Sequence, residues 1–285
     1  MNIFNIWQVD VIFFLFFTVI FNQSYKIVTK TSNKDGALTI LLQLLTGVIT
    51  LLWFPFFEIK FPTDLRIYFF LGLAVIFYAI EHRSNTTARR GIQSSTISIL
   101  GQVYTIFMII IGLIFFREPF VITKIMGALL IIFSNFLVFY KNGALKLNRY
   151  ILFGVLANLS MAIAGFVDIS ISNNFNLPIY VAITFIMPAF LIFLFERPKL
   201  SDIQSEFKNG NKAAIFITAF CWSSFSIVGL RAYLLGSVTT VVPLFALNVI
   251  LNILAGYIFL KERDNLFKKL IAGILVIISV ILIQI

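Results

Sequence analysis

Charged residues are scarce in this sequence. Only 12% of its 285 residues are Asp, Glu, Lys or Arg, whereas 60% are hydrophobic and the mean hydropathy is +1.00. A soluble domain of this composition would expose mostly apolar surface to water. The composition therefore excludes a soluble protein and predicts an all-α polytopic membrane protein.

Cysteine and histidine are also nearly missing, with one residue of each. The single Cys221 excludes an internal disulfide, and its apolar neighbours indicate a packing role. With only His82 there is no His/Cys set spaced for a metal, and we find no phosphate-binding glycine loop and no nucleophile beside a base. We therefore expect no enzyme activity, no metal and no cofactor.

Basic residues exceed acidic ones and give a formal net charge of +10. They lie in short gaps between apolar runs, as membrane topology requires, so we expect no nucleic-acid partner. Loops with odd numbers carry fifteen Lys and Arg and loops with even numbers carry five. By the positive-inside rule the odd loops are cytoplasmic and both termini lie outside.

Ten apolar stretches are long enough to span a bilayer as helices, and their runs do not alternate as the strands of a membrane barrel would. Only residues 196–211 are long and polar enough to form a substantial loop. The predicted helices cover residues 9–28, 37–57, 65–90, 92–116, 120–140, 150–171, 177–195, 212–233, 237–260 and 266–284.

An internal repeat organises these stretches. Residues 95–118 resemble residues 239–262 at an offset of 144, and both segments end in a basic residue followed by Glu. We therefore predict two units of five helices, residues 1–143 and 144–285. Because five crossings is an odd number, the second unit is inverted, and inverted repeats are typical of secondary transporters.

The third apolar run contains the most unusual stretch, residues 77–85. The run 65–80 has 16 residues, roughly 24 Å as a helix, which is too short to cross a bilayer. The repeat aligns its continuation with the eighth helix and extends it to residues 88–90. Glu81, His82 and Arg83 then lie inside the membrane, where an ionisable residue indicates a functional site. The alternative is a helix that ends at Ile80, with a polar loop over residues 81–93.

In its motifs the chain resembles the EamA family of the drug/metabolite transporter superfamily. The resemblance rests on residues 231–238, 242–244, 259–263 and Gly273 in the second half. The first half matches it less closely, at residues 98–100, 115–118 and Gly127. The resemblance implies a permease of a bacterial plasma membrane that moves a small organic solute through a central cavity by alternating access. Two features depart from it, since many relatives have cytoplasmic termini and the cluster at residues 81–83 is not a general family feature.

Helix geometry divides the polar residues of the third helix between two faces. Tyr78, Glu81 and Asn85 share one face, with His82 beside it, and Arg83 points away. A direct pair between Glu81 and Arg83 is therefore disfavoured. We expect Arg83 to pair with Asp168 of the sixth helix, and Glu81 with Lys26 or Arg231. The alternative is that these residues only stabilise the bundle, and Lys26 near a helix end is typical of a snorkelling anchor.

Further polar or aromatic side chains inside predicted helices complete the candidate substrate-binding set. Inside a bilayer they must find partners on other helices or line a wet cavity, and contacts between helices are the commoner role. His82, beside Glu81, is a candidate for proton coupling, and the alternative is a histidine that only makes a hydrogen bond. We interpret Glu118 and Glu262 as structural residues that fasten loops. The additional candidates are Asn22, Gln102, Tyr104, Trp222, Asn248 and Asn252.

Together these features predict a secondary transporter, a permease or exporter, for a small polar organic metabolite. The alternative function is an intramembrane lipid-handling, flippase-like protein or a receptor-like protein without solute transport.

Overall fold

The computed structural model describes residues 7–115, 121–141, 144–145, 147–236 and 238–284. In the first predicted unit the helices are α1 (Trp7–Thr31), α2 (Asp35–Leu51), α3 (Leu65–Gly91), α4 (Ser94–Leu100), α5 (Val103–Phe115) and α6 (Ile122–Phe139), with the 3-10 turn η2 (Phe54–Phe56). In the second they are α7 (Arg149–Ile171), α8 (Leu177–Glu196), α9 (Leu200–Asn209), α10 (Lys212–Leu235), α11 (Val238–Phe259) and α12 (Leu266–Gln284), with the 3-10 turn η3 (Ser172–Asn174).

Two short strands, β1 (Tyr140–Lys141) and β2 (Ala144–Leu145), pair antiparallel where the two predicted units meet. Of the two residues at the predicted unit boundary, residue 143 lies outside the described residues.

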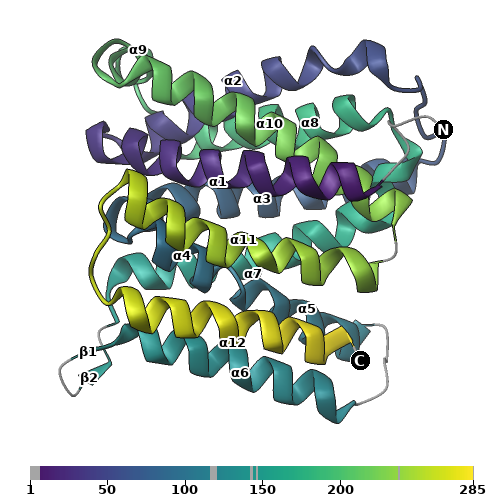
Figure 1. Ribbon diagram of the computed structural model, residues 1–285. Coiled ribbons are helices and arrows are strands. Elements are labelled where there is room, and N and C mark those ends of the chain that lie inside the picture. Colours follow the sequence, from purple (N-terminus) through teal and green to yellow (C-terminus); the bar gives the residue numbers. More distant parts are fainter. Residues whose placement is uncertain (1–6, 116–120, 142–143, 146, 237, 285) are drawn as a thin grey trace.

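The described chain forms a helical bundle (Figure 1), and eight of its helices are long and apolar enough to cross a membrane. Two predicted spans are not among the eight. The predicted fourth span, residues 92–116, is divided into α4 and α5, so the prediction of one continuous helix is wrong there. The predicted ninth span corresponds to α11, of which Leu244–Phe259 forms a shorter apolar helix.

The third helix runs to Gly91, so the alternative of a polar loop over residues 81–93 is wrong. The Asp64 side chain accepts a hydrogen bond from the Arg66 backbone N–H and caps its first turn. Glu81 and His82 are buried, 6% and 3% exposed. The helix therefore carries ionisable side chains into the bundle, as the repeat predicted.

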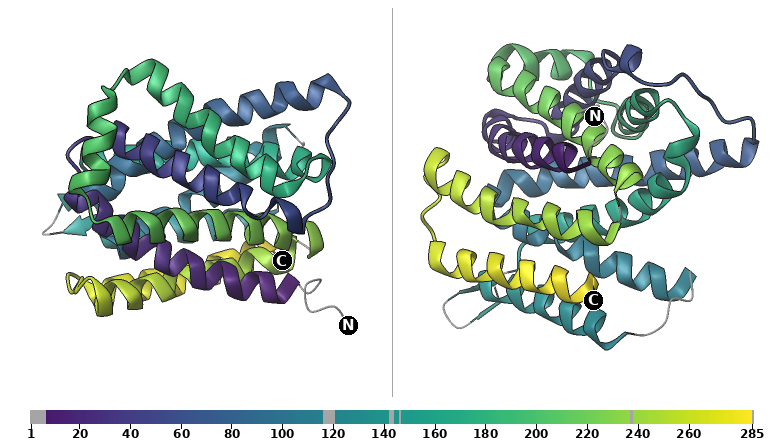
Figure 2. Two further views of the ribbon diagram at one scale, coloured as in Figure 1. Left: turned by 90° about the horizontal axis from the view of Figure 1, so that it is seen from above. Right: turned by 45° about the vertical axis from the view of Figure 1, so that its right-hand side comes forward.

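Helices from the two predicted units pack against each other in pairs. Helix α1 lies along α10, α3 along α7, α2 along α8, and α6 along α12 (Figures 1 and 2). The α6–α12 pair is close because Gly127 has no side chain, and a Cβ there would lie 2.7 Å from the Ser279 carbonyl oxygen. One apolar core joins α1, α2, α3, α7, α8 and α10, and a second joins α4, α6, α11 and α12.

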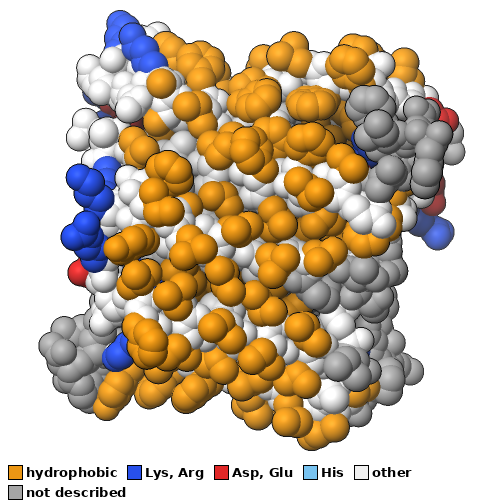
Figure 3. Space-filling model, viewed as in Figure 1, with side chains coloured by type: hydrophobic (Ala, Val, Ile, Leu, Met, Phe, Trp, Pro, Cys, Tyr) orange, Lys and Arg blue, Asp and Glu red, His pale blue; other side chains and the backbone are white. Residues whose placement is uncertain are grey.

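The surface separates apolar from basic side chains. Figure 3 shows hydrophobic side chains over most of the visible face and Lys and Arg side chains along its left edge. In Figure 1 that edge carries α9, the β1–β2 pair and the α11–α12 connection, and the start of α1 and the end of α12 lie at the opposite end. We call the α9 edge the basic end of the bundle. Which side of a membrane this end faces stays a prediction.

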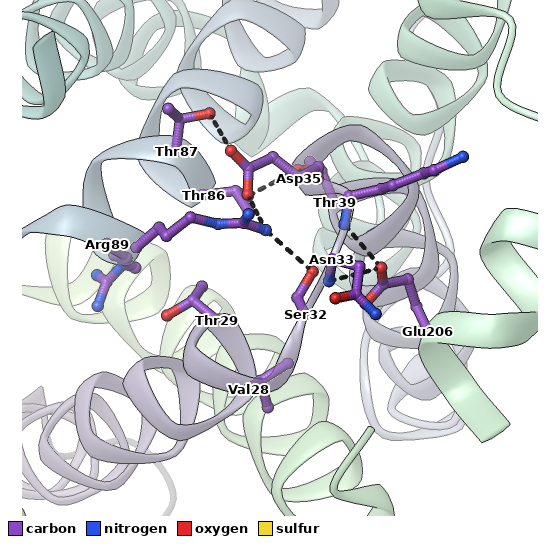
Figure 4. Close-up of polar contacts among 12 residues, drawn as sticks. Val28, Thr29, Ser32, Asn33, Asp35, Thr39, Thr86, Thr87, Arg89 and Glu206 are labelled. Atoms are coloured by element: carbon purple, nitrogen blue, oxygen red, sulfur yellow. Dashed lines mark hydrogen bonds and ion pairs between the residues drawn. The ribbon is translucent and has the colours of Figure 1, made fainter. Parts of the chain in front are cut away.

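Residues 196–211, predicted as a loop, contain helix α9, so that prediction is wrong. The helix docks on the start of α2 because buried Glu206 accepts hydrogen bonds from the backbone N–H groups of Asn33 and Lys34, at 3.1 and 2.8 Å (Figure 4). Lys34 also bonds Asp202 at 2.8 Å, which lowers the pKa of the Asp202 carboxyl. A ten-residue polar helix has no membrane-span signal, and this docking is visible only in three dimensions.

Candidate functional site

A cavity of about 380 Å³ lies among the helices of the bundle. Side chains from α1, α3, α4 and α5 line it on one part, and side chains from α7, α8, α10 and α11 on the other. Its volume and its lining of aromatic and apolar side chains with a few polar groups are typical of small-molecule sites. Sequence analysis chose no candidate residue from the predicted helix that corresponds to α8, which contributes Thr184 and Phe185 to the wall.

Most of the candidate residues from the sequence meet in this cavity. Arg83 and Asn252 are the two candidates that do not line it. Whether the others bind a substrate stays a prediction. The candidates that line the cavity are Asn22, Tyr78, Glu81, His82, Asn85, Gln102, Tyr104, Asp168, Trp222 and Asn248.

The break between α4 and α5 lies on the cavity wall. Gly101 and Gln102 both line the cavity. The backbone N–H groups of Gln102 and Tyr104 donate to carbonyls three residues earlier, at 3.1 and 3.2 Å, in place of the regular α-helical pattern. Such tighter turns within a helix often mark a functional hinge. The Gln102 and Tyr104 side chains are therefore positioned by a break that hydrophobicity alone does not reveal.

Glu81 lies in a chain of polar contacts along one face of α3. Its carboxylate contacts the His82 ring nitrogen Nδ1 and accepts a hydrogen bond from Asn85 Nδ2 at 2.9 Å. The predicted partners of Glu81 are wrong. Lys26 Nζ donates to backbone carbonyls at the end of α3, and Arg231 lies 3.5 Å from Asp10. The adjacent histidine and the side chain one turn away therefore satisfy Glu81 locally.

Aromatic rings hold the His82 imidazole in place. It stacks between Tyr78 and Phe185, with ring centroids 5.3 Å away on each side, and the Trp222 ring meets it edge-on at 4.9 Å. Among the described residues, neither ring nitrogen makes a hydrogen bond, although the Glu81 carboxylate lies against Nδ1. The one histidine of the chain is thus buried, fixed in orientation, and in contact with an acid on one side only.

Asp168 is bound by two tyrosines. The Tyr78 hydroxyl donates to Oδ2, and the Tyr180 hydroxyl donates to Oδ1 at 2.5 Å. The predicted pair between Asp168 and Arg83 is therefore wrong. Sequence reasoning missed Tyr180 because it lies in the apolar run of α8, between Ile179 and Val181. Only the tertiary fold brings its hydroxyl to Asp168 of α7.

Arg83 points to the basic end of the bundle. It pairs with Glu196 at the end of α8 and donates to Thr87, and its Nη1 lies 4.0 Å from Asp35. Figure 4 shows Asp35, at the start of α2, bonded to Thr87 of α3. Glu81 and Arg83 do not pair, as helix geometry predicted, but Arg83 fastens the bundle end and lies outside the cavity wall.

Asn252 connects two helices. It accepts a hydrogen bond from Gln23 Nε2 of α1 at 3.1 Å, and its own Nδ2 donates to the Asn248 carbonyl at 2.8 Å. Its side chain is fully buried. This is the helix-to-helix role that the sequence left as the alternative.

Glu262 fastens the α11–α12 connection to the start of α4. Its carboxylate accepts from the backbone N–H groups of Ser94 and Ser95, at 2.7 and 3.0 Å, and from the Ser95 hydroxyl. The Lys269 ammonium donates to that hydroxyl at 2.7 Å. The predicted structural role of Glu262 is confirmed, while Glu118 lies outside the described residues.

In comparisons with known proteins, no family model and no curated protein matches the chain.

Proposed function

We propose that this chain is a secondary transporter that moves a small polar organic metabolite across a membrane by alternating access. The proposal rests on one observation above the others. The cavity holds ionisable groups, and both sequence units contribute helices to its wall. Ionisable residues are costly inside a membrane bundle and mark substrate or ion pathways.

The packing of the helices supports the proposed inverted repeat of ten spans. In that scheme α1 corresponds to α7, and α3 corresponds to α10. The repeat therefore relates the contact between α1 and α10 to the contact between α7 and α3. Both contacts are among the most extensive in the bundle. The pairs α2–α8 and α6–α12 each join a helix to its own counterpart, as a two-fold axis between the units requires.

Membership of the EamA family is part of the same proposal. The family's two five-helix halves account for the helix pairs, and the broken fourth span supports a moving part. Broken helices at the repeat interface are common in transporters, where the freed backbone groups face the substrate pathway.

Proton coupling through Glu81 and His82 is the proposed energy source. Glu81 and His82 are in contact inside the bundle, and acidic residues and histidines within membrane helices form proton relays in pumps and transporters. Because one imidazole nitrogen has no described partner, a proton there can face a solute in the cavity.

The test is uptake into proteoliposomes containing the purified chain, with a metabolite mixture and mass-spectrometric readout, with and without a pH gradient. We expect flux in the wild type, dependence on the gradient, and loss of flux in Glu81→Gln. Glu58→Gln is the matched control because Glu58 is exposed and lies outside the cavity lining. Flux that is equal in protein-free liposomes would refute the transport proposal, and normal coupled flux in Glu81→Gln would refute the role of the acid.

A further inference from the structure

Arg89 is a buried guanidinium on the cavity wall. It lies at the end of α3, one turn beyond Asn85, and is 5% exposed. Its guanidinium carbon lies 4.9 Å from the ring centroid of Phe21 and 4.8 Å from that of Tyr25, both on α1. Stacking on two rings fixes the plane of the guanidinium and leaves its edge available for hydrogen bonds.

Most hydrogen-bond donors of this guanidinium have no partner. A guanidinium carries five N–H donors. Within the described part of the chain, only Nε donates, to Asn85 Oδ1 at 3.0 Å, and Nη1 is buried without a partner. The next residue differs, since Arg90 pairs with Asp35 at 2.5 Å. A buried charge without a carboxylate partner is costly. No carboxylate bonds Arg89 directly, and Glu81 acts on it only electrostatically, across the bridging side chain of Asn85.

The acids of the cavity are already bonded by their neighbours. Both oxygens of Asp168 accept from tyrosine hydroxyls. One oxygen of Glu81 accepts from Asn85 and the other contacts His82. Each carboxylate oxygen thus has a neighbour, whereas Arg89 keeps a buried N–H group without a partner among the described residues. This arrangement favours an anionic solute over a cationic one.

We propose, on the basis of the transport function above, that Arg89 binds an oxyanion carried by the solute, which is a small organic acid. The guanidinium fork matches the two oxygens of a carboxylate or phosphate and binds them with paired, charge-assisted hydrogen bonds. The aromatic wall around Trp222 and Phe225 receives the apolar body of the solute. Arg89 was not among the candidates chosen from the sequence, and its burial under α1 assigns it to the cavity.

The test measures equilibrium binding to the full-length chain in nanodiscs by isothermal titration calorimetry. The probes share one phenyl body and differ in the polar group: phenylacetate, phenyl phosphate, phenylacetamide and phenethylamine. We expect phenylacetate or phenyl phosphate to bind at least about tenfold more tightly than phenylacetamide, because hydrogen bonds to charged groups contribute about 1.5–3 kcal/mol. The stronger of the two anions identifies the oxyanion as carboxylate or phosphate.

Two variants test whether the preference for an anion depends on the Arg89 side chain. In Arg89→Gln the preference for the anion disappears, and in Arg89→Lys part of it remains because the charge is kept without the fork. Arg149→Gln is the matched control, since Arg149 is exposed at the start of α7 and keeps the full preference. Size-exclusion chromatography and thermal unfolding establish that each variant is folded.

No preference for an anion over the amide in the wild type overturns the inference, and so does an undiminished preference in folded Arg89→Gln. Anion binding without flux in proteoliposomes refutes the transport function and leaves the oxyanion site intact. Flux restricted to neutral or cationic solutes refutes the oxyanion site and leaves the transport function intact.

Discussion

The carboxylate of Glu262 joins the two halves of the chain at the basic end, so its removal should measurably weaken the bundle. It accepts three hydrogen bonds from Ser94 and Ser95 at the start of α4, and it interacts electrostatically with the buried ammonium of Lys26. The perturbation is Glu262→Gln, which keeps the shape, removes the charge and leaves one oxygen to accept.

The magnitude follows from the contacts that are lost. A hydrogen bond to a charged group contributes about 1.5–3 kcal/mol, and a charge at a helix N-terminus about 0.3–1 kcal/mol. Because glutamine retains one acceptor oxygen, we expect a loss of about 2–4 kcal/mol in the free energy of unfolding. For a chain of this size that corresponds to a decrease in Tm of about 5–10 °C. Glu262→Ala, which removes every acceptor, should lower Tm further.

The protein contains its own reporter for the assay. Cys221 is the only cysteine and is 3% exposed in α10, so a thiol-reactive dye labels it when the bundle opens. Thermal unfolding of the detergent-purified chain, followed by dye fluorescence, gives Tm for the wild type, Glu262→Gln and the exposed control Glu58→Gln. We expect the control within about 2 °C of the wild type. If Glu262→Gln also unfolds within 2 °C of the wild type, the three contacts do not stabilise the junction.

Three further substitutions test other contacts in the same assay. Gly127→Ala forces apart α6 and α12, which are in close contact, and should lower the free energy of unfolding by about 1–3 kcal/mol. In the control Gly72→Ala the added carbon has nothing within 4 Å, so Tm should stay equal or rise. Equal losses in both variants would contradict the packing argument. Tyr180→Phe removes one of the two hydroxyls on buried Asp168 and should cost about 1–3 kcal/mol, and an unchanged Tm would mean that the hydrogen bond contributes nothing. Arg83→Gln breaks a half-exposed ion pair worth about 0–1 kcal/mol, so Tm and proteoliposome uptake should both stay near wild type, and loss of uptake would return Arg83 to the binding site.

The sequence by itself determined the class of the fold and the helix that carries the site. Long apolar runs predict membrane helices because each must bury its backbone polar groups, and this signal is local. The repeat extended the third helix to residues 88–90, and the structure ends it at Gly91. Local helix geometry also placed Glu81 with Asn85 and away from Arg83, because side chains four residues apart share a face.

Partners on other helices were decided by tertiary structure alone. Asp168 bonds tyrosines on α3 and α8, Arg83 reaches Glu196, and Arg89 lies under the rings of α1. Hydrophobic patterns specify that a side chain is buried, but they do not specify which helix lies opposite it. That choice depends on how helices distant in the sequence pack together, and it decides which charges are neutralised within the protein and which remain available for a solute.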